Sequence, residues 1–90
     1  MAWKVEFHPD AARQLVTLAK RDRVTAQRIT STLATIADLD DPCTRGKGLT
    51  GSLAGLWRYR VGDWRVVVDL QDARLVIVAL DLNHRSTVYE

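Results

Sequence analysis

Residues 49–69, LTGSLAGLWRYRVGDWRVVVD, carry the most informative pattern in this chain for predicting its fold. Two runs of aromatic and β-branched residues flank the pair Gly62 and Asp63. A two-residue hairpin turn needs a positive φ, which glycine adopts without steric cost. The stretch therefore predicts two antiparallel strands joined by a tight turn at Gly62 and Asp63, preceded by a glycine-punctuated loop.

The turn fixes the register of the hairpin, and the register sorts its side chains onto two faces. One face is apolar and is predicted to pack in a core; it carries Trp57, Tyr59, Val61, Trp64, Val66 and Val68. Its aromatic rings could stack on nucleic-acid bases, but we expect core packing, because this face suits contact with helices.

The opposite face of the hairpin places Arg60 directly across from Arg65, with Arg58 two residues along the strand. Like charges that face each other destabilise a sheet, so a sequence shaped by stability alone would avoid this pairing. An anion between the guanidinium groups would remove the repulsion, which makes a polyanionic partner the first hypothesis. A solvated outer face with the arginines splayed apart is the alternative, since most surface charge is not functional.

The composition of the 90 residues is that of one ordered globular domain, residues 1–90, with two layers of secondary structure. The net charge is only +2, but between residues 45 and 65 one acidic residue opposes five basic ones: Arg45, Lys47, Arg58, Arg60 and Arg65. A locally basic sheet favours a nucleic-acid or acidic-protein partner over general membrane adhesion.

Cys43 is the single cysteine, so no intrachain disulfide can form. With no signal-like or long apolar segment, the sequence predicts a soluble cytoplasmic protein without a membrane span. His8, Cys43 and His84 lack the spacing of metal ligands, so we expect no metal and no cofactor.

The remaining elements follow from hydrophobic periodicity and from helix-breaking residues. They are a strand at residues 3–7, a helix from Pro9 to about Lys20, a second helix from Val24 to about Leu39, a loop over residues 40–55 and a strand at residues 75–82. The order strand, helix, helix, strand, strand, strand predicts an α+β fold. Its two N-terminal helices pack on one face of a small, mostly antiparallel four-stranded sheet.

Residues 83–89 close the chain as a short polar tail that contains His84. This histidine follows a buried strand, in a tail that can return over the open face of the sheet. It could titrate near neutral pH and transfer protons. A structural or solvated histidine is the alternative interpretation.

Three stretches together resemble the RelE/ParE superfamily of toxins of toxin–antitoxin systems: residues 49–53, 56–66 and 83–89. The resemblance covers essentially the whole chain and is closer to the RelE branch, whose members cleave mRNA on the ribosome. It implies an endoribonuclease that cuts A-site codons by attack of a ribose 2′-hydroxyl on the adjacent phosphate, and so inhibits translation.

When the family's motif is matched to this sequence, the resemblance implies that Arg65 stabilises the transition state. It also implies that Arg85 and Tyr89 are the arginine and the aromatic residue that the C-terminal tail contributes to the site. Arg58 and Arg60 occupy two strand positions that are often lysines in the best-studied branch. Arginine does not deprotonate at working pH. We therefore interpret Arg58 and Arg60 as binding RNA phosphates, together with Lys47 and Arg45. His84 is then the candidate base or acid, and Tyr89 orients the phosphate or the base stack.

The resemblance also implies partners: a cognate RelB-like antitoxin, mRNA in the ribosomal A site with ribosomal RNA, and operator DNA only through the antitoxin. Two alternatives remain at this point. One is a ParE-like inhibitor of DNA gyrase without nuclease activity, in which the basic face binds a protein. The other is a catalytically inactive relative that only binds its antitoxin.

Overall fold

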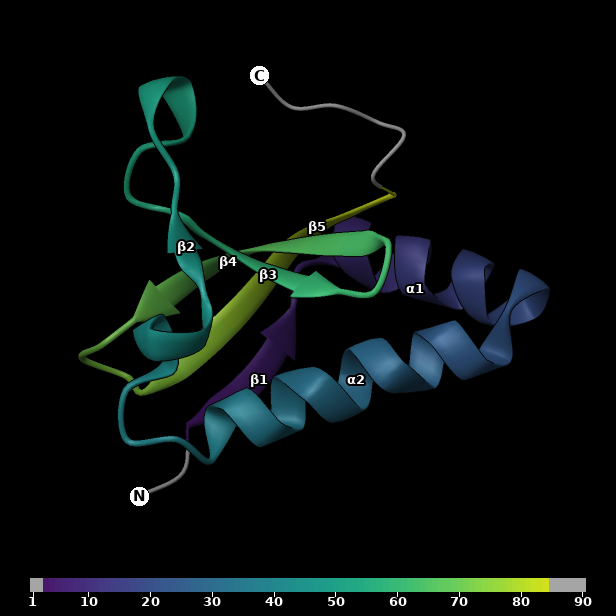
Figure 1. The fold of residues 1–90 in the computed structure, drawn as a ribbon, viewed down its shortest axis with the longest axis horizontal. Helices are drawn as coiled ribbons and strands as arrows, with labels where there is room; N and C mark the ends of the chain where they lie inside the picture. Colours follow the sequence, from purple (N-terminus) through teal and green to yellow (C-terminus); the bar gives the residue numbers. More distant parts are fainter. Residues whose placement is uncertain (1–2, 85–90) are drawn as a thin grey trace.

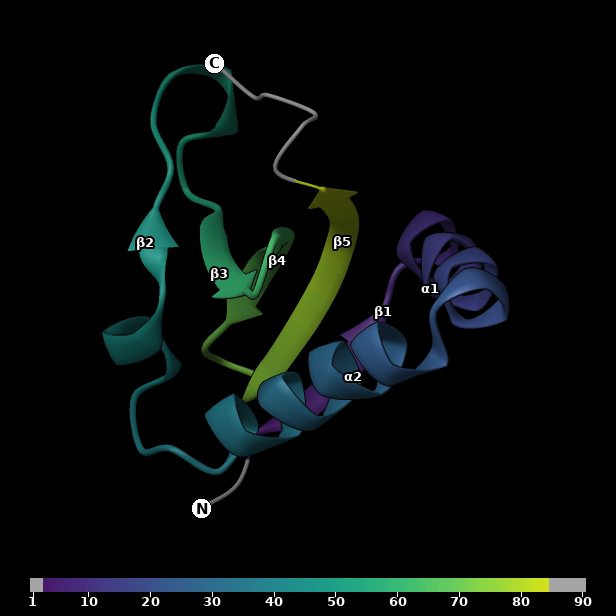
Figure 2. The same ribbon diagram turned by 45° about the vertical axis from the view of Figure 1, so that its right-hand side comes forward.

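The computed structural model describes residues 3–84, without the side chains of residues 44 and 45. Its elements in chain order are β1 (Lys4–Phe7), α1 (Pro9–Arg21), α2 (Arg23–Ala37), the 3-10 turn η1 (Pro42–Arg45), β2 (Lys47–Gly48), the 3-10 turn η2 (Gly51–Leu53), β3 (Trp57–Val61), β4 (Trp64–Gln71) and β5 (Val76–His84). The strands form one sheet in the order β1-β5-β4-β3-β2, in which β1 and β5 are parallel and the other neighbours antiparallel. Both helices cover the same face of this sheet (Figures 1 and 2).

The predicted α+β class is confirmed, but the sheet of the described residues has five strands rather than four. The additional strand, β2, lies in the segment that was expected to be a loop, and it pairs Lys47 with Arg58 and Gly48 with Trp57. Two residues carry no detectable hydrophobic period, so the sequence pattern could not indicate this strand. Gly46 lets the chain enter it, because a Cβ at this position would lie 2.7 Å from Cε1 of Tyr59.

Short side-chain caps determine where the helices begin. The Nδ1 atom of His8 accepts a hydrogen bond from the Asp10 backbone N–H at 3.2 Å, and Pro9 occupies the first turn of α1. Asp22 ends α1 and caps α2, where its Oδ1 accepts from the Thr25 N–H at 3.1 Å. The helices therefore turn back on each other within one residue.

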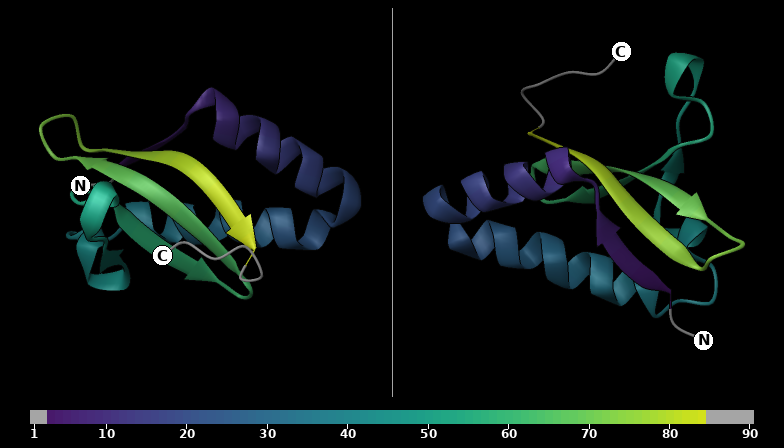
Figure 3. Two further views of the ribbon diagram at one scale, coloured as in Figure 1. Left: turned by 90° about the horizontal axis from the view of Figure 1, so that it is seen from above. Right: turned by 180° about the vertical axis from the view of Figure 1, so that it is seen from behind.

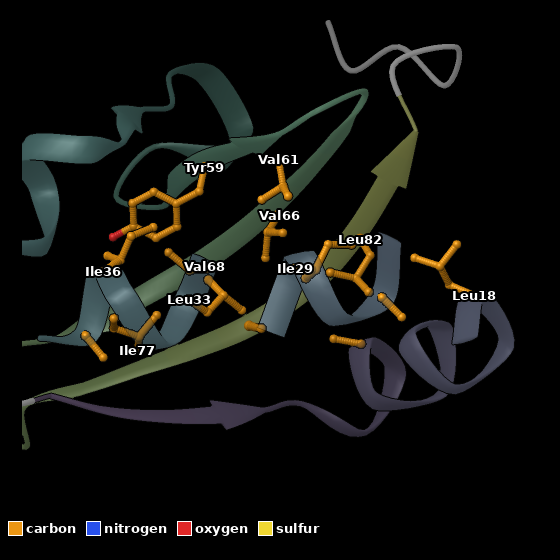
Figure 4. Close-up of a cluster of buried hydrophobic side chains, with 14 of the residues drawn as sticks. Leu18, Ile29, Leu33, Ile36, Tyr59, Val61, Val66, Val68, Ile77 and Leu82 are labelled. Carbon is orange, nitrogen blue, oxygen red and sulfur yellow. The ribbon is translucent and has the colours of Figure 1, made fainter. Parts of the chain in front are cut away.

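The core lies between α2 and the strands (Figure 4), and α2 contributes Ile29, Leu33 and Ile36 to it. Tyr59 is the largest fully buried side chain, at 1% exposure. Its hydroxyl donates a hydrogen bond to the Pro42 carbonyl at 3.0 Å, which satisfies the one polar atom of the ring. The predicted inward face of the hairpin is thereby confirmed.

A β-bulge interrupts the pairing of β4 and β5 between Val67 and Val68. Val68 pairs with Ala79 and Val67 with Asp81, so Leu80 is the extra residue. An extra residue reverses the alternation of the side chains beyond it. Ile77 and Ala79 face the helices before the bulge, and Leu82 faces them after it.

β5 continues to His84, two residues beyond the predicted end of the strand. Within residues 3–84, no helix is both long enough and apolar enough to cross a membrane.

Candidate nucleic-acid interface

The sheet face turned away from the helices carries a row of basic side chains. Arg60 is paired directly with Arg65, and Arg58 is paired with Lys47 on one side and Val67 on the other. Directly paired residues project on the same side of a sheet. These four basic residues, Lys47, Arg58, Arg60 and Arg65, therefore form one surface, here named the arginine face. The register that the Gly62 turn predicts is confirmed at every pair of β3 and β4.

Within residues 3–84, no ion pair neutralises the arginine face. Among the described residues, the ion pairs join Asp10 to His8 and Arg13, and Glu6 to Arg74. All of them involve acidic residues of β1 or α1. Arg60 is exposed, and Arg58 and Arg65 are half-buried, so the guanidinium groups remain accessible to an external anion. Two facing arginines with no acidic ion-pair partner among residues 3–84 make a binding site for phosphate groups chemically reasonable.

Two polar residues of β5 adjoin this row. Asn83 is paired with Arg65, and Asp81 is paired with Val67. Asn83 donates from Nδ2 to Asp81 Oδ2 at 2.9 Å, and Gln14 of α1 donates from Nε2 to Asp81 Oδ1 at 2.7 Å. Gln14 also accepts from the Leu82 N–H through Oε1 at 2.9 Å, so it holds this end of β5 to α1.

Sequence reasoning missed this group of hydrogen-bonded residues. The available signal was the spacing of Asp81 and Asn83, two polar residues one side-chain period apart at the end of an apolar strand. Gln14 gave no signal, because its contact spans 67 residues of sequence.

His84 does not lie with the arginines. It is paired with Trp64, whose neighbours on the same face are the core residues, and the two rings pack edge to face at 5.5 Å between centroids. His84 lines cavities with Trp64 and Asp22 on the helix side of the sheet. The expectation that His84 belongs to a tail over the open face is wrong, because β5 extends through it. The bulge at Leu80 then sets the face that it joins.

The other predicted site residues are Arg85, Tyr89 and Arg45. Arg85 and Tyr89 lie outside the described residues, as does the side chain of Arg45. Within the described part of the chain, no group of three histidine, cysteine or carboxylate side chains could hold a metal ion.

Comparison with known proteins identifies a family and a fold. The family described as "ParE toxin of type II toxin-antitoxin system, parDE" matches residues 5–89. Among curated proteins, none matches the sequence significantly.

The solved structures with the same fold include toxins in complex with antitoxins. The RelBE2 toxin–antitoxin complex of Mycobacterium tuberculosis contains a chain that is 28% identical, with a TM-score of 0.70; the match covers 94% of this chain and 100% of that one. The archaeal RelE–RelB complex of Pyrococcus horikoshii OT3 matches at 24% identity and a TM-score of 0.72, over 98% of this chain and 100% of that one. A mutant of E. coli RelE in the free state matches at 14% identity and a TM-score of 0.73, over 93% and 84% of the two chains.

Proposed function

The chain belongs to the ParE toxin family of type II toxin–antitoxin systems, within the RelE/ParE superfamily, and we propose that it is a ribosome-dependent mRNA endoribonuclease. In this proposal the protein acts in the cytoplasm, where it cuts A-site codons and so inhibits translation. The observation that carries the proposal is the direct pairing of Arg60 with Arg65 on the sheet face turned away from the helices, where no acidic residue of the described range 3–84 forms an ion pair with either arginine.

The chemistry of the reaction accounts for such a cluster. Attack of the ribose 2′-hydroxyl on the neighbouring phosphate forms a new P–O bond and passes through a phosphorane with two negative charges. The proton of the 2′-hydroxyl passes to a base, the bond to the 5′-oxygen breaks, and this oxygen takes up a proton, which leaves a cyclic phosphate and a 5′-hydroxyl. Fixed cations beside the phosphorane stabilise it more than they stabilise the singly charged substrate. We assign this role to Arg65, and phosphate binding to Arg58, Arg60 and Lys47.

The arginines that we assign to phosphate binding cannot also transfer the protons of the reaction. A guanidinium group stays protonated at working pH, so the arginines cannot act as the base. His84 packs on Trp64 at the opposite face, and a role in proton transfer would require its imidazole to reach around the end of β5. In our proposal the 2′-hydroxyl is therefore activated at the interface with the ribosome, with Arg85 and Tyr89 as the further site residues and Arg45 as a further phosphate contact.

A cognate antitoxin of the RelB type is the second partner that we propose. The similar chains from M. tuberculosis and P. horikoshii were solved as toxin–antitoxin complexes. Operator DNA would be bound through the antitoxin and not by this chain.

A ParE-like inhibitor of DNA gyrase is the alternative function. Two observations favour it: the matching family description names parDE, and neither described histidine lies on the arginine face. In this case the arginine face binds a protein and cuts no bond.

Primer extension on a defined mRNA in a purified translation system, beside a gyrase cleavage assay, distinguishes the two functions. We expect codon-phased cuts that require an occupied ribosome, and a loss of at least about 100-fold in cleavage rate for Arg65→Ala, the scale of removing one stabilising group from a transition state. Arg13→Ala removes an exposed arginine of α1 and is the matched control. Intact mRNA together with trapped gyrase–DNA complexes would refute the nuclease; an inactive relative would give neither signal.

A second variant, His84→Ala, tests whether His84 transfers protons in the cleavage reaction. We expect His84→Ala to keep the pH profile of cleavage, because His84 faces the helices. A pH profile of cleavage that changes in this variant would instead return the histidine to the site. Circular dichroism of each variant verifies that the fold is retained.

A further inference from the structure

Val67 is an apolar residue buried on the face that carries the arginines. It is only 4% exposed, yet it does not belong to the core cluster that the helices cover. Its direct strand partners are Arg58 on β3 and Asp81 on β5. An apolar side chain that is buried between charged neighbours, outside the core, requires a second apolar environment on this face.

The segment between β2 and β3 provides that environment. It rises on the side of the sheet opposite α2, with η2 at its far end (Figure 1 and Figure 3, right). A cavity of about 210 Å³ lies between this segment and the sheet, and it is lined by Leu49, Thr50, Gly51, Ser52, Leu53, Arg58 and Val67. Val67 forms its floor, since it is the one lining residue of β4.

The wall of the cavity is held by backbone hydrogen bonds. The Leu49 N–H donates to the Leu56 carbonyl at 2.9 Å, which closes the base of the segment, and the Ala54 N–H donates to the Gly51 carbonyl at 3.1 Å. Gly51 and Gly55 have φ values of 68° and 94°, in the left-handed region that glycine adopts most readily. The segment is therefore shaped before any ligand arrives.

The lining has the chemistry of a site for a planar ring. Two leucines and Val67 supply apolar surface, the hydroxyls of Thr50 and Ser52 can form hydrogen bonds, and the Arg58 side chain adjoins the cavity. Guanidinium groups and apolar side chains stack on unstacked bases, whose polar edges take hydrogen bonds.

The size and the position of the cavity agree with one base next to a phosphate. A cavity of about 210 Å³ has room for one planar base and is too small for a helix or strand. Arg58 belongs both to the lining and to the arginine face, next to Lys47 across the strand pair. A nucleotide brings both a ring for the cavity and an anion for Arg58, whereas an apolar peptide side chain brings no anion.

We propose that this cavity is a base-binding subsite, which holds an unstacked base of single-stranded RNA whose phosphate lies on Arg58. The inference rests on the proposed function, because it requires RNA on the arginine face. The subsite contributes to the choice of codon through the hydroxyls at its rim.

The test is a titration of the free protein, followed by NMR through the methyl groups of Leu49, Leu53 and Val67. The ligands are the four nucleoside 5′-monophosphates, ribose 5-phosphate and inorganic phosphate. We expect the methyl signals to shift with nucleotides, and the nucleotides to bind at least tenfold more tightly than ribose 5-phosphate. Equal affinity for ribose 5-phosphate would overturn the proposal, since it would show that phosphate alone is recognised.

Two tryptophan variants complete the test. Ser52→Trp adds an indole to the lining and should reduce nucleotide affinity at least tenfold, whereas Ala54→Trp changes an exposed residue of the same segment outside the lining and should not. If Ser52→Trp retains nucleotide affinity but binds the antitoxin less tightly, the cavity accepts a protein side chain and the proposal is wrong.

Cleavage on the ribosome by the wild type is scored separately, so failure of the subsite is distinguishable from failure of the proposed function. A wild type that cleaves, with a codon pattern that Ser52→Trp leaves unchanged, would overturn the subsite alone. A wild type that does not cleave would overturn the nuclease, whatever the titration gives.

Discussion

The two faces of the β3–β4 hairpin are formed by the same two strands, but one face is packed in the core and the other carries paired basic side chains. Toward the helices, Tyr59 and Val66 are at most 1% exposed, and the one polar atom between them is hydrogen-bonded. On the opposite face, Arg60 is paired directly with Arg65, and no ion pair within residues 3–84 neutralises either arginine. Like charges that face each other destabilise a sheet, so the packed face and not the arginine face accounts for the stability of the hairpin.

The largest effect is expected on the helix side. Tyr59→Ala should reduce the free energy of unfolding by about 3–5 kcal/mol, because it removes the largest fully buried side chain and its bond to Pro42. Arg60→Ala, in the neighbouring position of the same strand, should change stability by less than about 0.5 kcal/mol. Urea denaturation of both variants measures the contrast. A loss for Arg60→Ala as large as that for Tyr59→Ala would refute the division between the faces.

Gly46, just before β2, and Gly48, within it, test how tightly the chain packs against the side chains of β3. Gly46→Ala should destabilise the protein by about 1–3 kcal/mol, because the new Cβ would lie 2.7 Å from the Tyr59 ring and 3.2 Å from the Arg58 carbonyl oxygen. Gly48→Ala is the control, since its Cβ would make an ordinary contact with Trp57 at 3.7 Å. Thermal melts of both variants measure the effect. Equal melting temperatures would show that the chain near Gly46 moves aside freely.

The phenol of Tyr59 makes the stability of the helix-facing side depend on pH in the alkaline range. Burial, followed by the nearby Cys43 and Asp41, raises the pKa of Tyr59 to about 12. The phenol of an unfolded chain titrates near pH 10, so the folded state retains a proton that the unfolded state loses. The stability that Tyr59 contributes is therefore complete below about pH 10 and is lost as the pH rises toward 12. Tyr59→Phe should be the less stable protein at neutral pH, by about 1 kcal/mol for the lost hydrogen bond.

The difference between the wild type and Tyr59→Phe should then narrow as the pH increases above about 10. Urea denaturation across this range measures it. A difference that stays constant with pH would mean that Tyr59 ionises as easily in the folded protein as in the unfolded chain.

The smallest expected effect lies on the arginine face and has the opposite sign. Arg60→Glu converts a repulsive cross-strand pair into an attractive one, and should stabilise the protein by about 0.2–1 kcal/mol. Under the proposed function, the same variant should no longer inhibit growth, because a carboxylate would then lie where we propose that a phosphate binds. Thermal melts and growth inhibition measure the two effects. A destabilised variant would indicate that the arginines do not repel each other in the folded protein.

Much of the site and fold could be predicted because the signals are local. Gly62 fixed the register of β3 and β4, and with it the side of the sheet that Arg58, Arg60 and Arg65 occupy. The helices and the α+β class followed from hydrophobic period and caps. β2 could not be predicted, because two residues carry no period and their pairing depends on where Trp57 and Arg58 lie.

The neighbours of the arginine face depend on distant contacts. Gln14 reaches Asp81 across 67 residues, and Val67 lines one cavity with residues 49–53, a stretch that the sequence pattern predicts only as a loop. Such contacts have no sequence period, so no local pattern indicates them.

The two faces of the hairpin follow from the amino-acid sequence alone, because side chains alternate with a period of two and one glycine turn sets their phase. The face that His84 joins depends on the folded molecule, because the bulge at Leu80 shifts that phase without a local signal. The folded molecule also brings Val67 and residues 49–53 together around one cavity, which Arg58 of the arginine face lines as well. The pairing of distant segments is set by packing across the whole molecule, and a local pattern does not contain it.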